Sequence, residues 1–264
     1  MDSQIGAEQV GKERDRTGMR FDIGYRTDPG PRKGPNQDTI LAVLLAEHPL
    51  AALLIVADGM GGAKAGEHAS REAVNVIHRH LTEVGLPSPA DAPGRLRGAI
   101  LAANASIYEK SQRQREMAGM GCTVVVVLVL GRTYWVASVG DSRAYLIREG
   151  KSYQLTNDHT WVSARVREGV LTPAQAANHS LRHVLDRALG TRPTVEVDVW
   201  PADEIGEGDI LILCTDGLYG VVSDAEITAL ATRYKAQDAA NALVRRALEA
   251  STHDNVSVVV MRAW

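Results

Sequence analysis

Residues 50–62 read LAALLIVADGMGG, an unbroken apolar run that ends in an aspartate and a glycine-rich turn. Because Leu50–Ala57 is apolar at consecutive positions, it predicts a strand that is buried on both faces. Asp58 stands where this strand ends, and the glycines after it allow a backbone carbonyl or a substrate to come close. The stretch therefore predicts a core strand that delivers a carboxylate to its own end.

Four other aspartates occupy comparable positions at the ends of predicted strands. Hard divalent cations prefer oxygen ligands, and carboxylate, carbonyl and water together suit Mg²⁺ or Mn²⁺ better than zinc. If the strand ends converge, the carboxylates repel one another unless a cation lies between them. Asp-Gly and Asp-Asn pairs are also common turn residues, so the sequence alone leaves a purely structural role open at each position. The four are Asp38 before residues 39–45, Asp141 between two strands, Asp216 after Ile210–Cys214, and Asp254 before Val256–Met261.

Two tight turns organise the strands in the middle of the chain. Gly131-Arg132 has glycine first, as a type II′ turn prefers, and Glu149-Gly150 forms a second two-residue connection. Such short connections make antiparallel neighbours, because parallel strands need a long crossover. The predicted strands are Thr123–Leu130 and Thr133–Val139 around the first turn, and Ser142–Arg148 and Lys151–Leu155 around the second.

Helices are predicted on both sides of these hairpins. Ala65–Val84 repeats its apolar residues with a helical period, and a second helix follows it. Asp224–Thr232 and Gln237–Ala250 are predicted helices before the last strand, whereas Asn157–Gly190 favours short helices within a long loop. Hairpins beside paired helices indicate an α+β fold of packed antiparallel sheets flanked by helices.

The composition limits the class of protein. The chain has 264 residues, of which 45% are hydrophobic and 23% charged, as expected for a globular protein. Its net charge of −3 argues against nucleic acid as a partner. We expect one domain, residues 19–264, after a flexible polar arm, residues 1–18. No apolar run is long enough to span a membrane and the arm has no signal-peptide core, which favours a cytoplasmic protein.

Other types of site find little support. The glycines of residues 59–62 lack the spacing of a dinucleotide loop, and no phosphate-binding GxxxxGK[ST] motif follows. His179 and His183 are four residues apart without the glutamate of a zinc-protease helix, so we expect a surface or loop role. No GxSxG sequence supports a serine hydrolase. Cys122 and Cys214 form no CxxC pair and are expected to be reduced core residues.

The aspartates and their neighbours resemble the PP2C (PPM) family of metal-dependent protein phosphatases, and specifically its bacterial type. The resemblance covers residues 21–260, and the occurrence of eight motifs in order is far more specific than any one of them. The motifs are Asn36–Asp38, Val56–Gly62, Gly121–Thr123, Val139–Tyr145, Leu155–His159, Arg187–Gly190, Cys214–Leu218 and Asp254–Ser257.

The resemblance implies an α-β-β-α sandwich with metals at one edge of its two central sheets. It implies that Asp38, Asp58, Asp216 and Asp254 hold two Mn²⁺ or Mg²⁺ ions, with Asp58 bridging and the Gly59 carbonyl as a further ligand. Asp141, with Asp216, is implied as ligand of a weaker third ion. The Asn157–Gly190 region is expected to include a flap beside the site.

The implied activity is hydrolysis of phosphoserine and phosphothreonine in proteins. Two metals can lower the pKa of a bridging water and clamp the phosphoryl oxygens, so hydroxide attacks phosphorus directly and no phosphoenzyme forms. Phosphorylated proteins are the expected partners, including Ser/Thr kinases and their targets, and we expect a monomer.

Two positions depart from the family pattern. The family usually places an arginine five residues before the first aspartate, where it contacts the substrate phosphate; here this residue is Lys33, next to Arg32. Lysine offers a point charge instead of a planar fork. Either Lys33 contacts the phosphate with a weaker grip or Arg32 turns in to contact it, and we favour Lys33. Eukaryotic-type members carry a candidate general-acid histidine where this chain has Met60, which suggests that metal-bound water protonates the leaving group.

Two functions remain open from the sequence. The first is an active phosphatase, which the complete acidic set favours. The second is a binding module, a pseudophosphatase that uses the fold to hold a partner, and Lys33 is its only support in the sequence.

Overall fold

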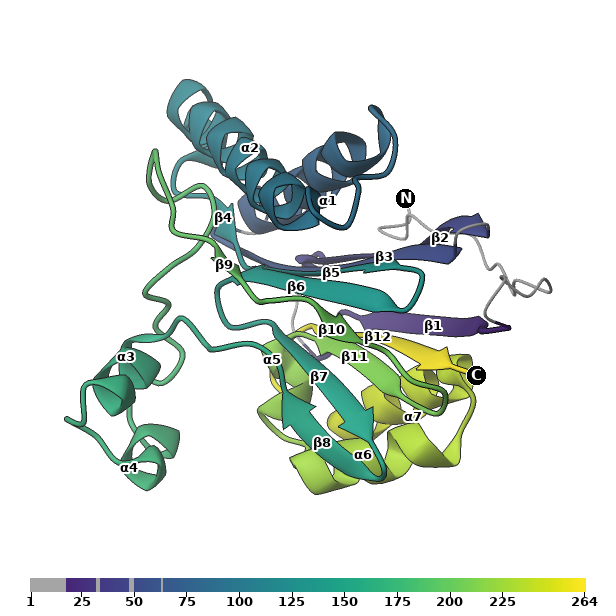
Figure 1. The fold of residues 1–264 in the computed structure, drawn as a ribbon. Helices are drawn as coiled ribbons and strands as arrows, with labels where there is room; N and C mark the ends of the chain where they lie inside the picture. Colours follow the sequence, from purple (N-terminus) through teal and green to yellow (C-terminus); the bar gives the residue numbers. More distant parts are fainter. Residues whose placement is uncertain (1–17, 32–33, 48–49, 63) are drawn as a thin grey trace.

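The computed structural model describes residues 18–31, 34–47, 50–62 and 64–264. The predicted arm, residues 1–18, lies outside this part of the chain except for Gly18, and so do Arg32 and Lys33. Within the described residues the chain forms two antiparallel sheets with helices on their outer faces (Figure 1).

The first sheet is built around the apolar stretch quoted above. Its main strands run in the order β10-β6-β5-β3-β2, with β4 paired to β3 and β9 paired to β6. Every residue from Leu50 to Ala57 is buried, as the consecutive apolar pattern predicts. The strands are β2 (Asp38–Glu47), β3 (Leu50–Met60), β4 (Gly121–Cys122), β5 (Val124–Leu130), β6 (Thr133–Val139), β9 (Asp198–Val199) and β10 (Asp203–Glu204).

The second sheet has the order β1-β12-β11-β7-β8. Its first strand, β1, was not expected from the sequence, because polar residues interrupt its apolar ones. The strands are β1 (Phe21–Asp28), β7 (Arg143–Arg148), β8 (Lys151–Gln154), β11 (Ile210–Cys214) and β12 (Val256–Ala263).

Both predicted turns are present. Gly131 has φ +61 and joins β5 to β6, in agreement with glycine at the first turn position. Glu149 and Gly150 both have positive φ, 52 and 73, and join β7 to β8. The hairpins therefore form where the sequence places them.

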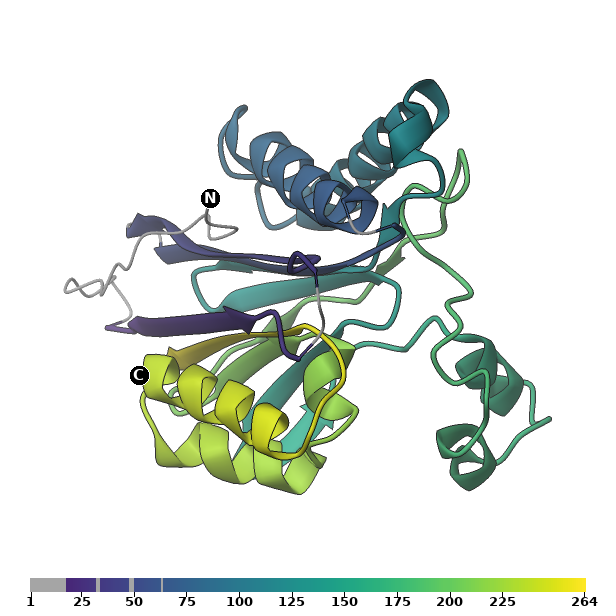
Figure 2. The ribbon, with the colours of Figure 1, turned by 180° about the vertical axis from the view of Figure 1, so that it is seen from behind.

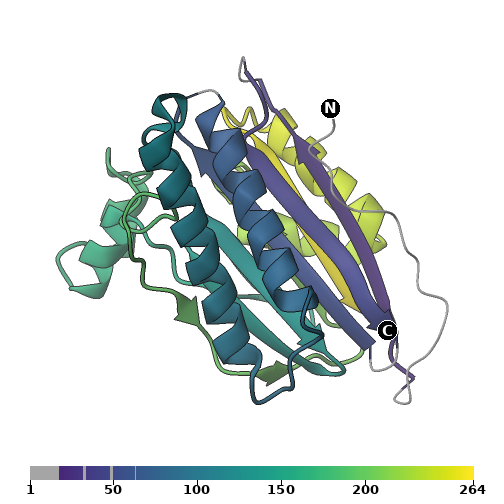
Figure 3. The same ribbon diagram turned by 90° about the horizontal axis from the view of Figure 1, so that it is seen from above.

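Helix pairs cover the outer face of each sheet (Figures 2 and 3). The helices α1 (Ala65–Thr82) and α2 (Ala92–Arg113) pack on the first sheet, and α6 (Asp224–Arg233) and α7 (Ala236–Glu249) pack on the second. A third apolar cluster fills the space between the sheets. The short helices η1 (Arg115–Met117) and α5 (Asp216–Tyr219) complete the sandwich.

Residues 160–185 form a separate lobe, called the flap below. It contains α3 (Trp161–Arg167) and α4 (Pro173–Ala177), the short helices expected within the long loop. Figure 1 shows both helices projecting to one side of the sandwich. The flap begins and ends at one point, because Trp161 N donates to Val184 O at 2.8 Å.

Candidate active site

The first two predicted ligands are neighbours in the first sheet. Asp38 on β2 and Asp58 on β3 are direct partners in the antiparallel register. Asp38 is buried, whereas Asp58 is partly exposed to a cavity. Like charges directly opposite each other destabilise a sheet, so this pair needs a proton or a cation nearby.

Asp216 joins this pair from the second sheet. It begins α5, directly after β11, and the preceding Thr215 Oγ1 donates to Asp38 Oδ2 at 3.0 Å. Thr215 Oγ1 also accepts a hydrogen bond from Ser257 N on β12 at 3.0 Å. One threonine hydroxyl therefore ties the two sheets together at the acidic edge.

Asp254 is held there by its neighbour Asn255. The Asn255 side chain accepts from Gln37 N at 2.9 Å and donates to Pro29 O at 2.8 Å. These bonds join the start of β12 to the segment that precedes β2. The Asp254-Asn255 pair therefore forms a structural turn and also places a carboxylate at the cavity. A role as a turn residue and a role as a metal ligand do not exclude each other here.

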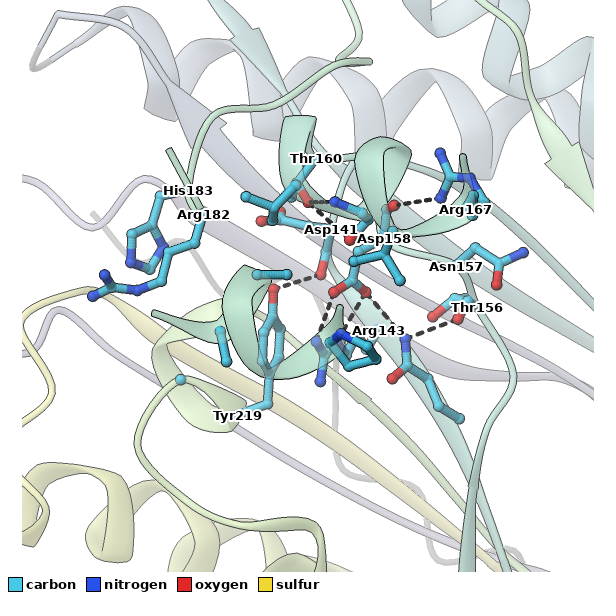
Figure 4. A pocket seen from close by; sticks show the side chains of 18 residues that line it. Asp141, Arg143, Thr156, Asn157, Asp158, Thr160, Arg167, Arg182, His183 and Tyr219 are labelled. Carbon is cyan, nitrogen blue, oxygen red and sulfur yellow. Dashed lines mark hydrogen bonds and ion pairs between the residues drawn. The ribbon is translucent and has the colours of Figure 1, made fainter. Parts of the chain in front are cut away.

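Asp141 lies in the turn between β6 and β7, on the flap side of the cavity. Its backbone oxygen accepts from the Tyr219 hydroxyl at 2.9 Å, and the Arg143 guanidinium lies 3.6 Å from the centre of the same ring. Asp158 holds Arg143 through two hydrogen bonds of 2.9 and 2.6 Å. Figure 4 shows this group beside Asp141.

One cavity of about 680 Å³ brings these groups together. Asp58, Gly59, Asp141, Asp216 and Asp254 line it, and Asp38 lies beneath as the strand partner of Asp58. The carboxylates surround the cavity without converging on one point, since no three His, Cys, Asp or Glu side chains of the described residues form an assembled metal cluster.

The electrostatics of the cavity favour a cation. Burial raises the pKa of Asp38 to about 7, and the charges of Asp216 and Asp254 add to the effect against hydrogen bonds from Ser257 and Thr215. Burial, followed by Asp38 and Asp216, raises the pKa of Asp58 well above its usual value. Burial and Asp216 also raise the pKa of Asp141 to about 7. The carboxylates therefore bind protons strongly unless another positive charge is present.

The residues present fit a hard divalent cation. Asp38 Oδ1 is buried and has no hydrogen-bond partner among the described residues, which is costly for a carboxylate oxygen unless it binds an ion. The donor set consists of carboxylates and backbone carbonyls, which suits Mg²⁺ or Mn²⁺. Gly59 is closely enclosed, since a Cβ there would lie 2.1 Å from Gly66 O. A side chain at this position would disturb the rim of the cavity.

A second cavity, of about 710 Å³, adjoins the first beneath the flap (Figure 4). Asp141, Arg182 and His183 line both cavities. His183 was expected to have only a surface or loop role, but its Nδ1 lies 3.7 Å from Asp216 Oδ2. The expectation was incomplete because the fold of residues 160–185, and not a local motif, carries His183 to the site.

Met60 and Cys122 line the same edge without a polar role. Met60 pairs with Gly121 in the β3–β4 register, and its side chain packs against Gly121. Cys122 is fully buried, and burial raises the pKa of its thiol, so it is not available as a thiolate nucleophile. The histidine that the eukaryotic-type pattern would place here is replaced by an apolar contact.

Comparison with known proteins decides the family. A model of the protein phosphatase 2C family matches residues 31–258. The chain belongs to this family. Serine/threonine protein phosphatase PstP of Mycobacterium tuberculosis is 35% identical over 243 residues, which cover 89% of this chain and 43% of PstP. This protein phosphatase 2C member thus spans less than half the length of that curated relative.

Two further comparisons cover nearly all of the matched protein. Serine/threonine phosphatase stp of Listeria innocua is 31% identical over 239 residues, which cover 90% of this chain and 94% of stp. A crystal structure of the PstP catalytic domain in complex with two manganese ions has a TM-score of 0.81 and 33% identity, covering 93% of this chain and 99% of that one. These comparisons confirm the predicted α-β-β-α fold and the resemblance to bacterial-type members.

Proposed function

We propose that the chain is a protein serine/threonine phosphatase that depends on Mn²⁺ or Mg²⁺. The observation that carries the proposal is the meeting of carboxylates from both sheets at one cavity. Their raised pKa values support the proposal, because carboxylates that are slow to lose their protons are stabilised by added positive charge. The names of the relatives and the two manganese ions in the PstP structure support the same conclusion.

For the cations we propose the ligand set that the family resemblance implies, which the carboxylates around the cavity support. Two ions would take Asp38, Asp58, Asp216, Asp254 and the Gly59 carbonyl, with Asp58 between them, and a weaker third would take Asp141 with Asp216. Divalent cations, when bound, would neutralise the charge of the phosphoryl group and activate water. No phosphoenzyme is proposed, and the buried state of the Cys122 thiol supports this.

Residues around the carboxylates fix the positions of Asp38 and Asp58. The Thr215 hydroxyl orients Asp38, and Thr123 binds the backbone of Asp58 through hydrogen bonds of 3.0 and 2.8 Å. His183 and Arg182 of the flap line the cavity and could contact an anionic substrate there. Preorganised groups of this kind can supply much of the catalysis of phosphoryl transfer.

Lys33 remains the proposed phosphate contact, five residues before Asp38. It lies outside the described residues, and the proposal rests on its spacing and charge. Lys33→Ala should raise KM for a phosphopeptide while Mn²⁺ affinity stays unchanged, and Lys33→Arg should retain or improve activity. A loss of Mn²⁺ affinity in Lys33→Ala with an unchanged KM would remove the assignment.

The partners and the cellular location are also proposals. We take phosphorylated proteins, including Ser/Thr kinases and their targets, as substrates of a cytoplasmic monomer. No described helix has both the length and the apolar character needed to cross a bilayer.

The deciding experiment is hydrolysis of a phosphothreonine peptide by purified protein in EDTA, Mg²⁺ and Mn²⁺. Turnover with either metal and none in EDTA supports the proposal. Metal binding without turnover in any condition would instead favour the pseudophosphatase hypothesis.

A further inference from the structure

A fully buried histidine connects the flap to the acidic edge and has no part in the function proposed so far. His159 has no exposed surface, and both of its ring nitrogens are engaged. Nδ1 accepts a hydrogen bond from Gly140 N at 3.0 Å, and Nε2 lies 3.0 Å from Asp198 Oδ2 on β9. The ring thus lies between a strand of the first sheet and the residue before Asp141.

The partners of the ring fix its tautomer. A backbone N–H can only donate, so Nδ1 must carry a lone pair and Nε2 must carry the proton that it donates to Asp198. Arg187 Nη1 donates to the other oxygen of Asp198 at 2.8 Å, which fixes the carboxylate in turn. Burial lowers the pKa of His159, although Asp198 opposes the effect, and the neutral ring is what this arrangement requires.

The backbone of His159 strengthens the same junction. His159 N donates to Gly140 O at 2.9 Å, so the two residues exchange a pair of hydrogen bonds. His159 O accepts from Asp186 N at 2.8 Å, directly after the flap ends. One residue therefore holds the Gly140–Asp141 turn and both ends of the flap together.

The Gly140–Asp141 turn also contacts residues that line the cavity. Gly140 has φ +102, and a Cβ on it would lie 2.6 Å from the Thr123 side chain. Thr123 in turn receives the backbone N–H of Asp58. His159 is therefore linked to Asp141 because its hydrogen-bond partner Gly140 is the preceding residue in the chain. It is linked to Asp58 because Gly140 packs against Thr123.

We propose that His159, oriented by Asp198, is a positioning residue that fixes the Gly140–Asp141 turn and thereby the Asp141 carboxylate. The inference rests on the proposed role of Asp141 as a ligand of the weaker third cation. It resembles a Ser-His-Asp triad in the way a carboxylate selects a histidine tautomer, but the ring here holds a backbone amide and moves no proton. Residues that orient a metal ligand without binding the metal themselves commonly affect metal affinity.

Two amide variants separate this role from simple packing. In His159→Asn the side-chain oxygen replaces Nδ1 and can still accept from Gly140, whereas in His159→Gln the amide nitrogen replaces Nε2 and reaches only Asp198. The proposal expects His159→Gln to weaken the weakest Mn²⁺ site by about ten- to a hundredfold, the usual effect of such a residue. It expects His159→Asn to stay within about threefold, although Asn leaves the larger void.

Asp198→Asn tests the same link from a partly exposed position, where misfolding is a smaller risk. Arg187 would take the single amide oxygen, so the amide nitrogen would face His159 Nε2 and drive the proton to Nδ1, against Gly140 N. The loss of Mn²⁺ affinity should match that of His159→Gln. In the unchanged protein, ¹⁵N NMR of the imidazole should show protonated Nε2 and unprotonated Nδ1.

The experiment measures Mn²⁺ binding to the full chain by electron paramagnetic resonance of the free ion, with thermal unfolding as a check on folding. An effect in His159→Gln and Asp198→Asn that His159→Asn lacks supports the proposal. Equal loss in the two His159 variants, greater loss in His159→Asn, or a proton on Nδ1 overturns it. Asp141→Asn is the reference: if it too binds Mn²⁺ like the unchanged protein, the role of Asp141 is wrong and the positioning role falls with it, whereas metal-dependent turnover would still stand.

Discussion

The sandwich and the flap meet at one cavity, but they bury very different amounts of apolar side chain. β3, which carries Asp58, buries every residue from Leu50 to Ala57 between two packed layers. The flap helices α3 and α4 bury one side chain each, Val162 and Ala176. The flap also leaves Val170 63% exposed.

This difference in burial places rigid and more mobile parts of the molecule around the same cavity. Segments with few buried apolar contacts open locally at low free energy, whereas core strands open only when the whole domain unfolds. Asp38 and Asp58 are therefore fixed by the core, while Asp141 lies where the sandwich joins the flap. Changes on the sandwich side should affect activity most, and changes in the flap should affect it least.

The largest effect is expected for Asp58→Asn. The substitution keeps the shape of the side chain and the backbone bonds to Thr123 but removes the charge that is proposed to lie between two cations. Turnover should fall by about a thousandfold or more, since metal-ion catalysis supplies several kcal/mol. The rate with a phosphothreonine peptide at saturating Mn²⁺ measures this, with circular dichroism as the folding control; a rate within tenfold of the unchanged protein would contradict the bridging role.

Asp141→Ala should have a smaller effect, because Asp141 lies at the junction with the flap. Two cations should remain bound while turnover falls roughly ten- to a hundredfold, the range expected when a weaker metal site is disturbed. Mn²⁺ stoichiometry and the rate constant are measured together. Loss of all bound Mn²⁺ would mean that Asp141 belongs to the core set and that the contrast between sandwich and flap does not extend to the metals.

The sandwich was also the more predictable of the two regions. Its buried strands and hairpins follow from apolar runs and from turn residues such as Gly131, whose signals lie within a few neighbours. β1 was missed because its fit is tertiary: a Cβ on Gly24 would lie 2.2 Å from Gln237 N on α7, and no local pattern shows that contact.

For the site, the sequence supplied the carboxylates but not what surrounds them. Each of the five aspartates lies next to a strand end and in a motif, and the fold brings all of them to one edge. His183 gave no such signal, and the motif that contains His159 did not indicate what the side chain of His159 does. His183 reaches the cavity only because the flap folds back beside α5, and the role of His159 depends on Asp198, which is 39 residues away in the sequence.

Metal removal should give the acidic edge an unusual pH dependence. In the folded chain the pKa of Asp38 and of Asp141 is about 7, against 3.8 for an ordinary aspartate. Between pH 4 and 7 the folded state therefore binds more protons than the unfolded state, so the free energy of unfolding of metal-free protein falls as pH rises through this window. One pKa unit corresponds to about 1.4 kcal/mol, so between pH 6 and pH 8 each of the two carboxyls should cost about that much, roughly 3 kcal/mol together.

Urea unfolding in EDTA at pH 6 and pH 8, repeated with Mn²⁺, measures this effect. The ion should restore the stability at pH 8 because it replaces the protons. The buried His159, with its lowered pKa, acts in the opposite direction below pH 6.5, so Asp38→Asn is the matched control and should remove much of the fall. Stability that rises with pH in EDTA, with no difference between Asp38→Asn and the unchanged protein, would contradict the raised pKa values.

The smallest effect gives the sharpest test of the comparison, because the same capping motif occurs in both regions. Ser223 caps α6 in the sandwich with Glu226, and Thr172 caps α4 in the flap with Gln175. Replacing a cap by alanine typically costs about 1 kcal/mol of helix stability. Ser223→Ala should therefore lower the free energy of global unfolding by about that amount.

Thr172→Ala should leave the free energy of global unfolding nearly unchanged and instead speed amide exchange in α4, because a flap that opens locally adds little to the cooperative core. Equal losses in the two variants would mean that the flap unfolds together with the sandwich, and that its sparse packing does not make it an independent unit.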